Sequence, residues 1–240
     1  MKRNLLLSIV LTGVLLSQLL IMSCDKEDND SGGNDNDSQQ SIHDTITDVD
    51  NNQYPTIKIG DQVWMAENLK VTQYNDSTPI EHIGTSASDW ENTTSGAYCW
   101  YENDQSNKEL YGALYNWYAV ETGKLCPQGW HVPTEEEWQT LIDFVSSEGY
   151  QGNEAEALKA ETLWIDGGTG SDEFFFGALP GGTRSRYGNF SSSDWSGHWW
   201  TATEYDSDLA WQFDMSSYEP EVIRSYFHKP VGFSVRCVKD

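Results

Sequence analysis

The sequence predicts an α+β fold: a compact single domain with two or three short helices and an antiparallel sheet, placed after a disordered tether. Every Trp, Tyr and Phe lies in residues 54–240, so only this part of the chain can bury a large aromatic core. Its patterns run in the order hairpin, helices, strands, which is typical of α+β rather than alternating α/β folds. The stretch before it is acidic and lacks aromatic residues, which is typical of disorder.

The first 23 residues have the pattern of a secretory signal peptide. Lys2 and Arg3 precede an apolar stretch over residues 5–22, and the small residue Ser23 stands directly before Cys24. A transmembrane helix is the alternative, but the apolar stretch is near the lower length limit for a span and mainly acidic residues follow it. The segment resembles a bacterial lipoprotein signal peptide, which implies a mature chain that starts at Cys24 and carries lipid there.

Residues 24–47 are expected to form an acidic disordered tether, followed by the folded domain over residues 48–240. Residues 25–52 contain nine acidic residues and one lysine. A flexible chain of this length spans about 30 Å, which lifts a domain clear of a membrane surface. The acidic residues after Cys24 resemble the signals that send Bacteroidetes lipoproteins to the exterior face of the outer membrane; a plain spacer is the alternative.

The charge of the chain restricts its partners. The net charge of −24 becomes −26 once cleavage removes the two basic residues of the signal peptide. Such a charge repels nucleic acid and anionic lipid surfaces. We therefore expect no nucleic-acid partner, and a membrane contact only through the lipid on Cys24.

The first half of the domain predicts a hairpin, a long loop and a short helix. Alternation over residues 54–65 indicates a hairpin that turns at Gly60-Asp61, with Ile57, Ile59 and Val63 as the alternating apolar set and Met65 as a candidate fourth member. Polar residues over 75–109 favour loop, and apolar spacing over 111–122 favours a helix.

The clearest helix is expected to begin at Thr134, because Thr134 and Glu137 have the spacing of a capping box. The apolar residues Trp138, Leu141, Ile142 and Val145 then share one helical face, and Gly149 ends the helix. A second helix is expected from Glu154 to Leu163. The strands predicted after it are residues 174–179, 199–203, 209–215, 222–227 and 233–238.

Six ordered motifs resemble the Fibrobacter succinogenes major paralogous domain, over about residues 48–240. They are residues 59–69, 111–117, 126–134 with Trp138, 178–182, 200–204 and 232–238. The resemblance implies a lipid-anchored or secreted surface domain and no assigned reaction. The helix start after Trp130 and the closing Gly-Phe-x-x-Arg-Cys strand also resemble the C-type-lectin-like fold, which formylglycine-generating enzymes share.

Three cysteines remain after Cys24, namely Cys99, Cys126 and Cys237. Export places them in an oxidising compartment, where three thiols allow three different single bridges. The lectin-like resemblance implies a bridge between Cys126 and Cys237, which leaves Cys99 as a small buried residue. A thiol site like that of formylglycine-generating enzymes would need two neighbouring thiols, and only one remains.

We expect no catalysis and no cofactor or metal. The five histidines are scattered without zinc spacing, and serine elbows and phosphate loops are absent. Residues 48–52 lack the Gly and Glu that complete a calcium loop, so a turn is favoured. A second acidic cluster leaves calcium as an alternative. Its members are Glu204, Asp206, Asp208 and Asp214.

The predicted function is a lipid-anchored cell-surface binding or adhesion module, with a glycan or a surface protein as its partner. Aromatic rings beside polar groups suit carbohydrate faces, and such rings gather between residues 194 and 208. The candidate ligand-binding residues are Trp195, Trp199, Tyr205, Asp206 and Asp208. Trp195 is the main candidate, because its loop is rich in Ser, Asp and Gly and therefore buries its ring less readily than the following strand would. The alternatives are a surface-display domain without a ligand and a formylglycine-generating-type enzyme.

Overall fold

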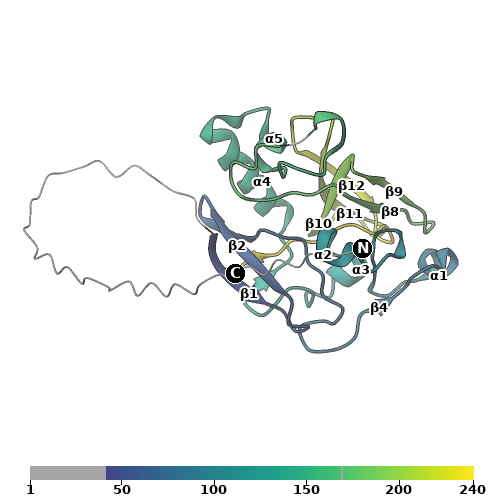
Figure 1. Cartoon of the computed structure of the whole chain (residues 1–240). Coiled ribbons are helices and arrows are strands. Elements are labelled where there is room, and N and C mark those ends of the chain that lie inside the picture. The colour runs from purple at the N-terminus through teal and green to yellow at the C-terminus, as the bar shows by residue number, and fades with distance from the viewer. Residues whose placement is uncertain (1–41, 169) are drawn as a thin grey trace, which may run out of the picture. The chain divides into compact units, whose positions relative to one another are not determined.

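A five-stranded antiparallel sheet contains both the first and the last strands of the folded part. Its strand order is β1-β2-β3-β13-β7, so the last strand lies between β3, from the first hairpin, and β7 (Figure 1). The computed structural model describes residues 42–168 and 170–240. The strands of this sheet are β1 Ile42–Thr47, β2 Gln53–Ile59, β3 Gln62–Met65, β7 Trp130–His131 and β13 Val238–Lys239.

Three smaller sheets and several short helices complete the α+β fold. The sheet β10-β11-β12 is antiparallel, β4-β5-β6 contains one parallel pair, and β8 pairs with β9. Their strands are Glu81–His82 (β4), Ala97–Cys99 (β5), Leu114–Tyr115 (β6), Gly181–Arg184 (β8), Phe190–Ser193 (β9), Ser196–Glu204 (β10), Leu209–Ser216 (β11) and Ile223–His228 (β12). The helices are α1 Ala87–Asn92, α2 Asn107–Tyr111, α3 Trp117–Val120, α4 Glu135–Val145 and α5 Glu154–Leu158, with 3-10 turns at Tyr101–Asn103 and Ile165–Gly167.

The predicted start of helix α4 is confirmed. Thr134 Oγ1 accepts from the amide of Glu137, and the Glu137 carboxylate accepts from the amide of Thr134 at 2.7 Å. The helix buries Trp138, Leu141 and Val145 and passes into a π-helical turn over Ser146–Tyr150.

Two of the predicted helices differ from the structure. Helix α5 ends at Leu158 rather than Leu163, because Lys159 leaves the helix to form a bridge with Ala178. The helix predicted over residues 111–122 is divided into the end of α2, strand β6 and helix α3. Gly112 interrupts it at φ +75, where a Cβ atom would lie 2.8 Å from the carbonyl oxygen of Leu69.

The predicted hairpin is confirmed, but its predicted alternating set is wrong. The two-residue turn pairs Ile57 with Trp64 and Lys58 with Val63. Trp64 therefore shares one face with Ile57, while Val63 and Met65 lie with Lys58 on the other face.

The folded part already includes strand β1, which the sequence placed inside the tether. The predicted turn at residues 48–52 is confirmed, because Asp48 Oδ1 accepts from the amides of Asp50 and Asn52, both at 2.9 Å. That turn returns the chain so that β1 pairs with β2. The prediction of disorder rests on the average composition of the whole acidic stretch, and this average does not reveal the short strand-forming segment within it. The signal peptide, Cys24 and the tether up to residue 41 lie outside the described residues.

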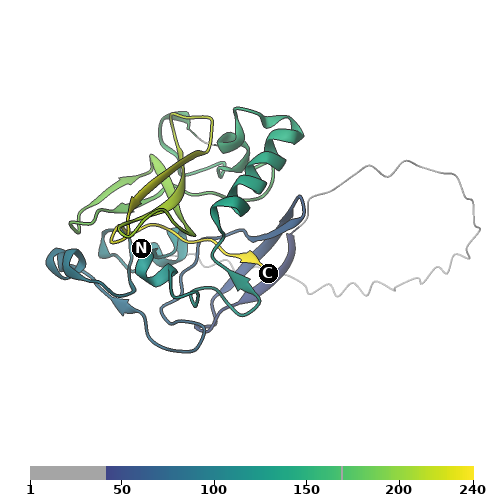
Figure 2. The ribbon, with the colours of Figure 1, turned by 180° about the vertical axis from the view of Figure 1, so that it is seen from behind.

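Strand β10 lies between two apolar cores. In Figures 1 and 2 the β10-β11-β12 sheet lies between helix α4 and the β8-β9 hairpin. Trp199 packs into the core beneath α4, and Trp200 packs into the core with Phe233 and Tyr115. Alternation along β10 therefore buries both tryptophans, because both faces of the strand are covered.

Two predicted strands are absent as regular strands. Residues 174–179 cross the core as a loop in which Phe174 and Phe176 are buried. Of residues 233–238, only Val238 belongs to a strand, while Phe233 and Ser234 form single bridges. The aromatic and apolar spacing in these segments reflects core contacts made from irregular backbone.

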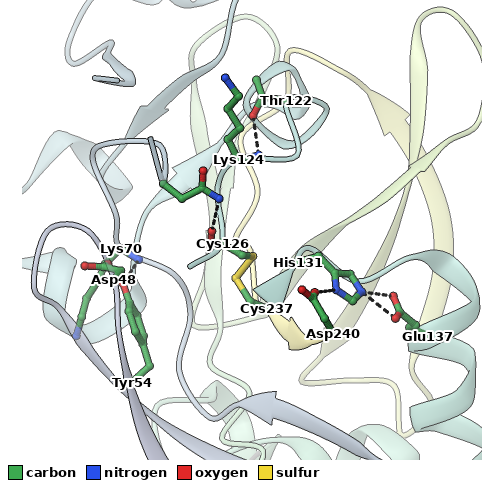
Figure 3. The surroundings of a disulfide bond; sticks show 11 residues. Asp48, Tyr54, Lys70, Thr122, Lys124, Cys126, His131, Glu137, Cys237 and Asp240 are labelled. Carbon is green, nitrogen blue, oxygen red and sulfur yellow. Dashed lines mark hydrogen bonds and ion pairs between the residues drawn. A yellow bond between two sulfur atoms is a disulfide. The ribbon is translucent and has the colours of Figure 1, made fainter. Parts of the chain in front are cut away.

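The predicted disulfide is confirmed. Cys126 and Cys237, separated by 111 positions, are bonded, and Cys99 is a buried free thiol. Figure 3 shows the bond tying the segment before β7 to the segment before β13. Across the described ranges, no helix has the length and apolar character needed to cross a membrane. The C-type-lectin-like resemblance stays a prediction.

Candidate functional site

Trp195 and Tyr218 form an exposed aromatic corner. Their ring centroids are 6.1 Å apart and their planes meet at 88°. The two side chains are 52% and 61% exposed, respectively. Trp195 lies between β9 and β10, and Tyr218 follows β11, so two separate loops build the corner.

Main-chain hydrogen bonds hold these two loops together. The amide of Ser217 donates to the carbonyl oxygen of Trp195 at 2.8 Å. The amide of Ile165 donates to the carbonyl oxygen of Asp194 at 2.9 Å. Asp194 has a φ of +67, in the left-handed region, and this tight turn directs the chain from β9 into β10. The ring of Trp195 is therefore exposed on backbone that is fixed on both sides.

A shallow hollow of about 240 Å³ adjoins the corner, with Tyr218 as one of its walls. The other lining residues are Glu156, Lys159, Gly167, Gly168, Ser217, Glu219 and Pro220. The hollow therefore combines hydrogen-bond donors and acceptors beside two exposed rings. Ligand sites commonly have this composition.

Lys159 is the buried charged group of the hollow, with only 4% of the residue exposed. Its Nζ donates to the carbonyl oxygen of Ser216 at 3.0 Å and lies 5.2 Å from the ring centre of Trp164. Burial lowers the pKa of Lys159, and the nearby Glu156 carboxylate opposes this shift.

A second aromatic cluster lies at the opposite end of β10. Tyr205 and Tyr226 stack with centroids 4.1 Å apart, and Trp211 meets both rings edge to face. Strand β10 separates Trp195 from Tyr205 by about 30 Å at the usual rise per residue. The structure therefore divides the single site predicted for residues 194–208 into two surfaces.

Trp199 does not belong to either surface, so its prediction as a ligand-contacting residue is wrong. Its side chain is fully buried, and its Nε1 donates to Oδ1 of Asn68 at 2.8 Å. The sequence pattern could not show that both faces of β10 are covered.

The predicted acidic residues serve different local roles. Asp206 Oδ1 accepts from the amides of Asp208 and Leu209 at the turn between β10 and β11, and Asp208 is exposed. Glu204 forms an ion pair with Lys229, and Asp214 accepts from Gln212. In residues 42–168 and 170–240, no group of three His, Cys, Asp or Glu side chains is placed to hold a metal ion.

A larger cavity of about 690 Å³ lies on the five-stranded sheet. Val63, Trp130 and Lys239 line it together with residues of β1 and β2, and its one aromatic residue, Trp130, is half-buried. No sequence pattern predicts this cavity, or the position of Tyr218 and Lys159 beside Trp195. These groups come together only through tertiary packing.

Comparison with known proteins places the chain in one family. The family model of the Fibrobacter succinogenes major domain matches residues 57–239, which is most of the chain. No curated protein and no solved structure matches the chain. The chain therefore belongs to the Fibrobacter succinogenes major domain family.

Proposed function

We propose that this protein is a lipid-anchored cell-surface binding module that holds a glycan at the Trp195–Tyr218 corner. The corner itself is the observation that carries the proposal, because two rings that are each more than half exposed meet at a right angle. The apolar face of a sugar ring can lie on one aromatic ring while its edge contacts the other. Contiguous exposed apolar surface of this kind commonly marks a binding site.

The surroundings of the corner supply the polar half of such a site. Ser217, Glu156 and Glu219 line the neighbouring hollow, where their hydroxyl and carboxylate oxygens suit sugar hydroxyl groups. The loops that carry both rings are cross-linked by main-chain hydrogen bonds. A fixed loop loses little conformational entropy when a ligand binds.

The cellular placement rests on the sequence before the described residues. The basic start, the apolar stretch and Ser23-Cys24 support export and lipid attachment to Cys24, with the acidic stretch as a spacer to an exterior-facing domain. Cys24→Ser is expected to release the protein from the detergent phase in which the wild type partitions. A variant that still partitions like the wild type would contradict lipid anchoring.

A glycan-array screen tests the binding function. Wild-type protein, purified from membranes in detergent, is expected to retain a related set of glycans, and Trp195→Ala is expected to lose them. Tyr187→Ala is the matched control, because Tyr187 is also half exposed but lies in the β8-β9 turn. Retention by Trp195→Ala would contradict the assigned site, and no retention by the wild type would favour a display domain without a ligand.

A further inference from the structure

Lys159 lines the hollow beside the Trp195–Tyr218 corner, and its ammonium group has unused hydrogen-bonding capacity. Lys159 Nζ has three N–H donors, and the carbonyl oxygen of Ser216 accepts one of them. Within the described residues, no carboxylate forms an ion pair with Lys159; the face of Trp164 is its other close partner. Since the residue is 4% exposed, these donors favour an acceptor brought by a ligand.

The protein groups around Lys159 restrict what that acceptor can be. A sugar hydroxyl that accepts from Nζ keeps its own proton, so one oxygen atom would have to reach both Lys159 and a carboxylate of Glu156 or Glu219, at a cost in hydrogen-bond geometry. A group that only accepts avoids this cost. Carbonyl and carboxylate oxygens are the two common groups of this kind.

Charge distinguishes these two groups. Glu156 and Glu219 line the same hollow, and the chain has a net charge of −24. A ligand carboxylate would be repelled by both side chains and by the field of the whole protein. A neutral carbonyl keeps the hydrogen bond to Lys159 without that repulsion.

The carboxylates of Glu156 and Glu219 can also accept a hydrogen bond from the N–H of a ligand amide. Both carboxylates lie in exposed residues at the hollow and are acceptors when ionised. An amide N–H could donate to one of them while the amide oxygen accepts from Lys159. On a sugar, a ring substituent with one carbonyl and one N–H is an acetamido group.

We infer that the hollow receives the acetamido group of an N-acetylated sugar, with Lys159 as the donor to its carbonyl oxygen. This inference rests on the proposed function, since the sugar ring itself would lie against Trp195 and Tyr218. It adds a selectivity: the module prefers N-acetylated glycans to neutral glycans without acetamido groups and to acidic glycans.

Titration calorimetry with three soluble tetrasaccharides tests this selectivity. The probes are chitotetraose, cellotetraose, which has the same linkage without acetamido groups, and a tetramer of uronic acid. The wild type is expected to bind chitotetraose at least tenfold more tightly than cellotetraose and to bind the uronate most weakly. This comparison needs no variant, so it does not depend on whether a buried lysine can be replaced.

Variants then assign the preference to one side chain. Lys159→Met is expected to reduce chitotetraose affinity about tenfold, to the level of cellotetraose, with cellotetraose affinity unchanged. Trp195→Ala is expected to lose both ligands. Lys124→Met, at an exposed lysine paired with Asp76, is the control and is expected to change neither affinity.

The outcomes separate this inference from the proposed function. Equal wild-type affinity for chitotetraose and cellotetraose, with both lost in Trp195→Ala, would overturn the role of Lys159 and leave the glycan site in place. Preference for the uronate, or an undiminished chitotetraose preference in Lys159→Met, would overturn the inference as well. Absence of binding to every glycan in the array would overturn both proposals.

Discussion

Oδ1 of Asn68 accepts a hydrogen bond from Nη2 of Arg236 at 3.0 Å, although 168 positions separate the two residues. Both residues are buried, and the same Oδ1 also accepts from Nε1 of Trp199 at 2.8 Å. Arg236 further donates to the main-chain oxygens of Phe176 and Gly177. Burial lowers the pKa of Arg236 to about 9, with the charges of Asp172 and Glu67 opposing the shift. This buried junction joins the hairpin segment to β10 and to the end of the chain.

Removing the shared acceptor is expected to destabilise the domain. Asn68→Ala leaves the buried donors of Trp199 and Arg236 without this acceptor, at about 1–3 kcal/mol for each donor left unpaired. Equilibrium unfolding in guanidinium chloride measures the loss. Asn189→Ala, at an exposed asparagine, is the control and should remain within about 0.5 kcal/mol of the wild type. Equal stability of the two variants would show that the junction contributes little.

The disulfide is expected to supply a large share of the stability. In the chain-entropy model, closing a loop of this length contributes about 4–5 kcal/mol. The double variant Cys126→Ser/Cys237→Ser should therefore unfold at a much lower denaturant concentration. Thiol-blocked peptide mapping should show Cys126 joined to Cys237. A linkage that includes Cys99 would contradict the structure.

The reactivity of the free thiol of Cys99 also tests the structure. Burial raises the pKa of its thiol to about 12, with the charge and hydrogen bond of Arg184 opposing the shift. Alkylating reagents should therefore modify Cys99 only after unfolding. Rapid alkylation of the folded protein would place Cys99 at an accessible site instead.

His131 makes part of the stability dependent on pH. Its Nδ1 lies 2.7 Å from Asp240 Oδ1, and its Nε2 lies 2.8 Å from Glu137 Oε1 (Figure 3). Burial opposes protonation, but the hydrogen bonds and charges of Asp240 and Glu137 outweigh it and raise the pKa of His131. The folded state therefore binds this proton more tightly than the unfolded state.

The resulting stabilisation is complete below the unfolded pKa of about 6.5 and is lost as pH rises through the raised folded value. His131→Gln should therefore be destabilised relative to the wild type more at about pH 5 than at about pH 9. Denaturant unfolding of both proteins across this range measures the difference. A gap that is constant with pH, or wider at high pH, would contradict the ion pairs at His131.

Short sequence patterns correctly predict the elements whose structure depends on residues close to them in sequence. The capping box at Thr134 and the two-residue turn at Gly60-Asp61 are such signals, and both are confirmed. Helix α5 is shorter than predicted because a tertiary bridge from Lys159 to Ala178 ends it. Residues 42–47 contain one acidic residue and four β-branched residues, but the acidic residues before them dominate the average composition; the turn after them reverses the chain so that they pair with β2.

The candidate site was predictable only in part, for a similar reason. The polar loop around Trp195 indicated an exposed ring, and the ring is exposed. The partner ring of Tyr218 and the ammonium of Lys159 come from segments separated from it in sequence. The prediction that Trp199 contacts a ligand is wrong because its face of β10 is covered by an apolar core, and the residues of that core, such as Trp138, lie far away along the chain.

Trp195 and Trp199 are expected to respond oppositely to the same substitution. Trp199→Ala removes a fully buried indole and should cost about 3–5 kcal/mol of stability. Trp195→Ala removes a half-exposed ring and should change the melting temperature little, while removing glycan binding. The melting temperatures of both variants, compared with that of the wild type, test this difference in stability. A large drop for Trp195→Ala would assign its ring to the core and leave the glycan site without its main residue.

Hydroxyl-radical footprinting with mass spectrometry tests glycan binding at the corner most directly, because it uses the unaltered protein. Saturation with a glycan retained in the array should lower the oxidation rates of Trp195 and Tyr218 together. The exposed rings of Tyr205 and Tyr226, at the other end of β10, serve as internal controls and should keep their rates. Unchanged oxidation of Trp195 and Tyr218 under saturating glycan, or protection of Tyr205 and Tyr226 instead, would contradict the assignment of the ligand site.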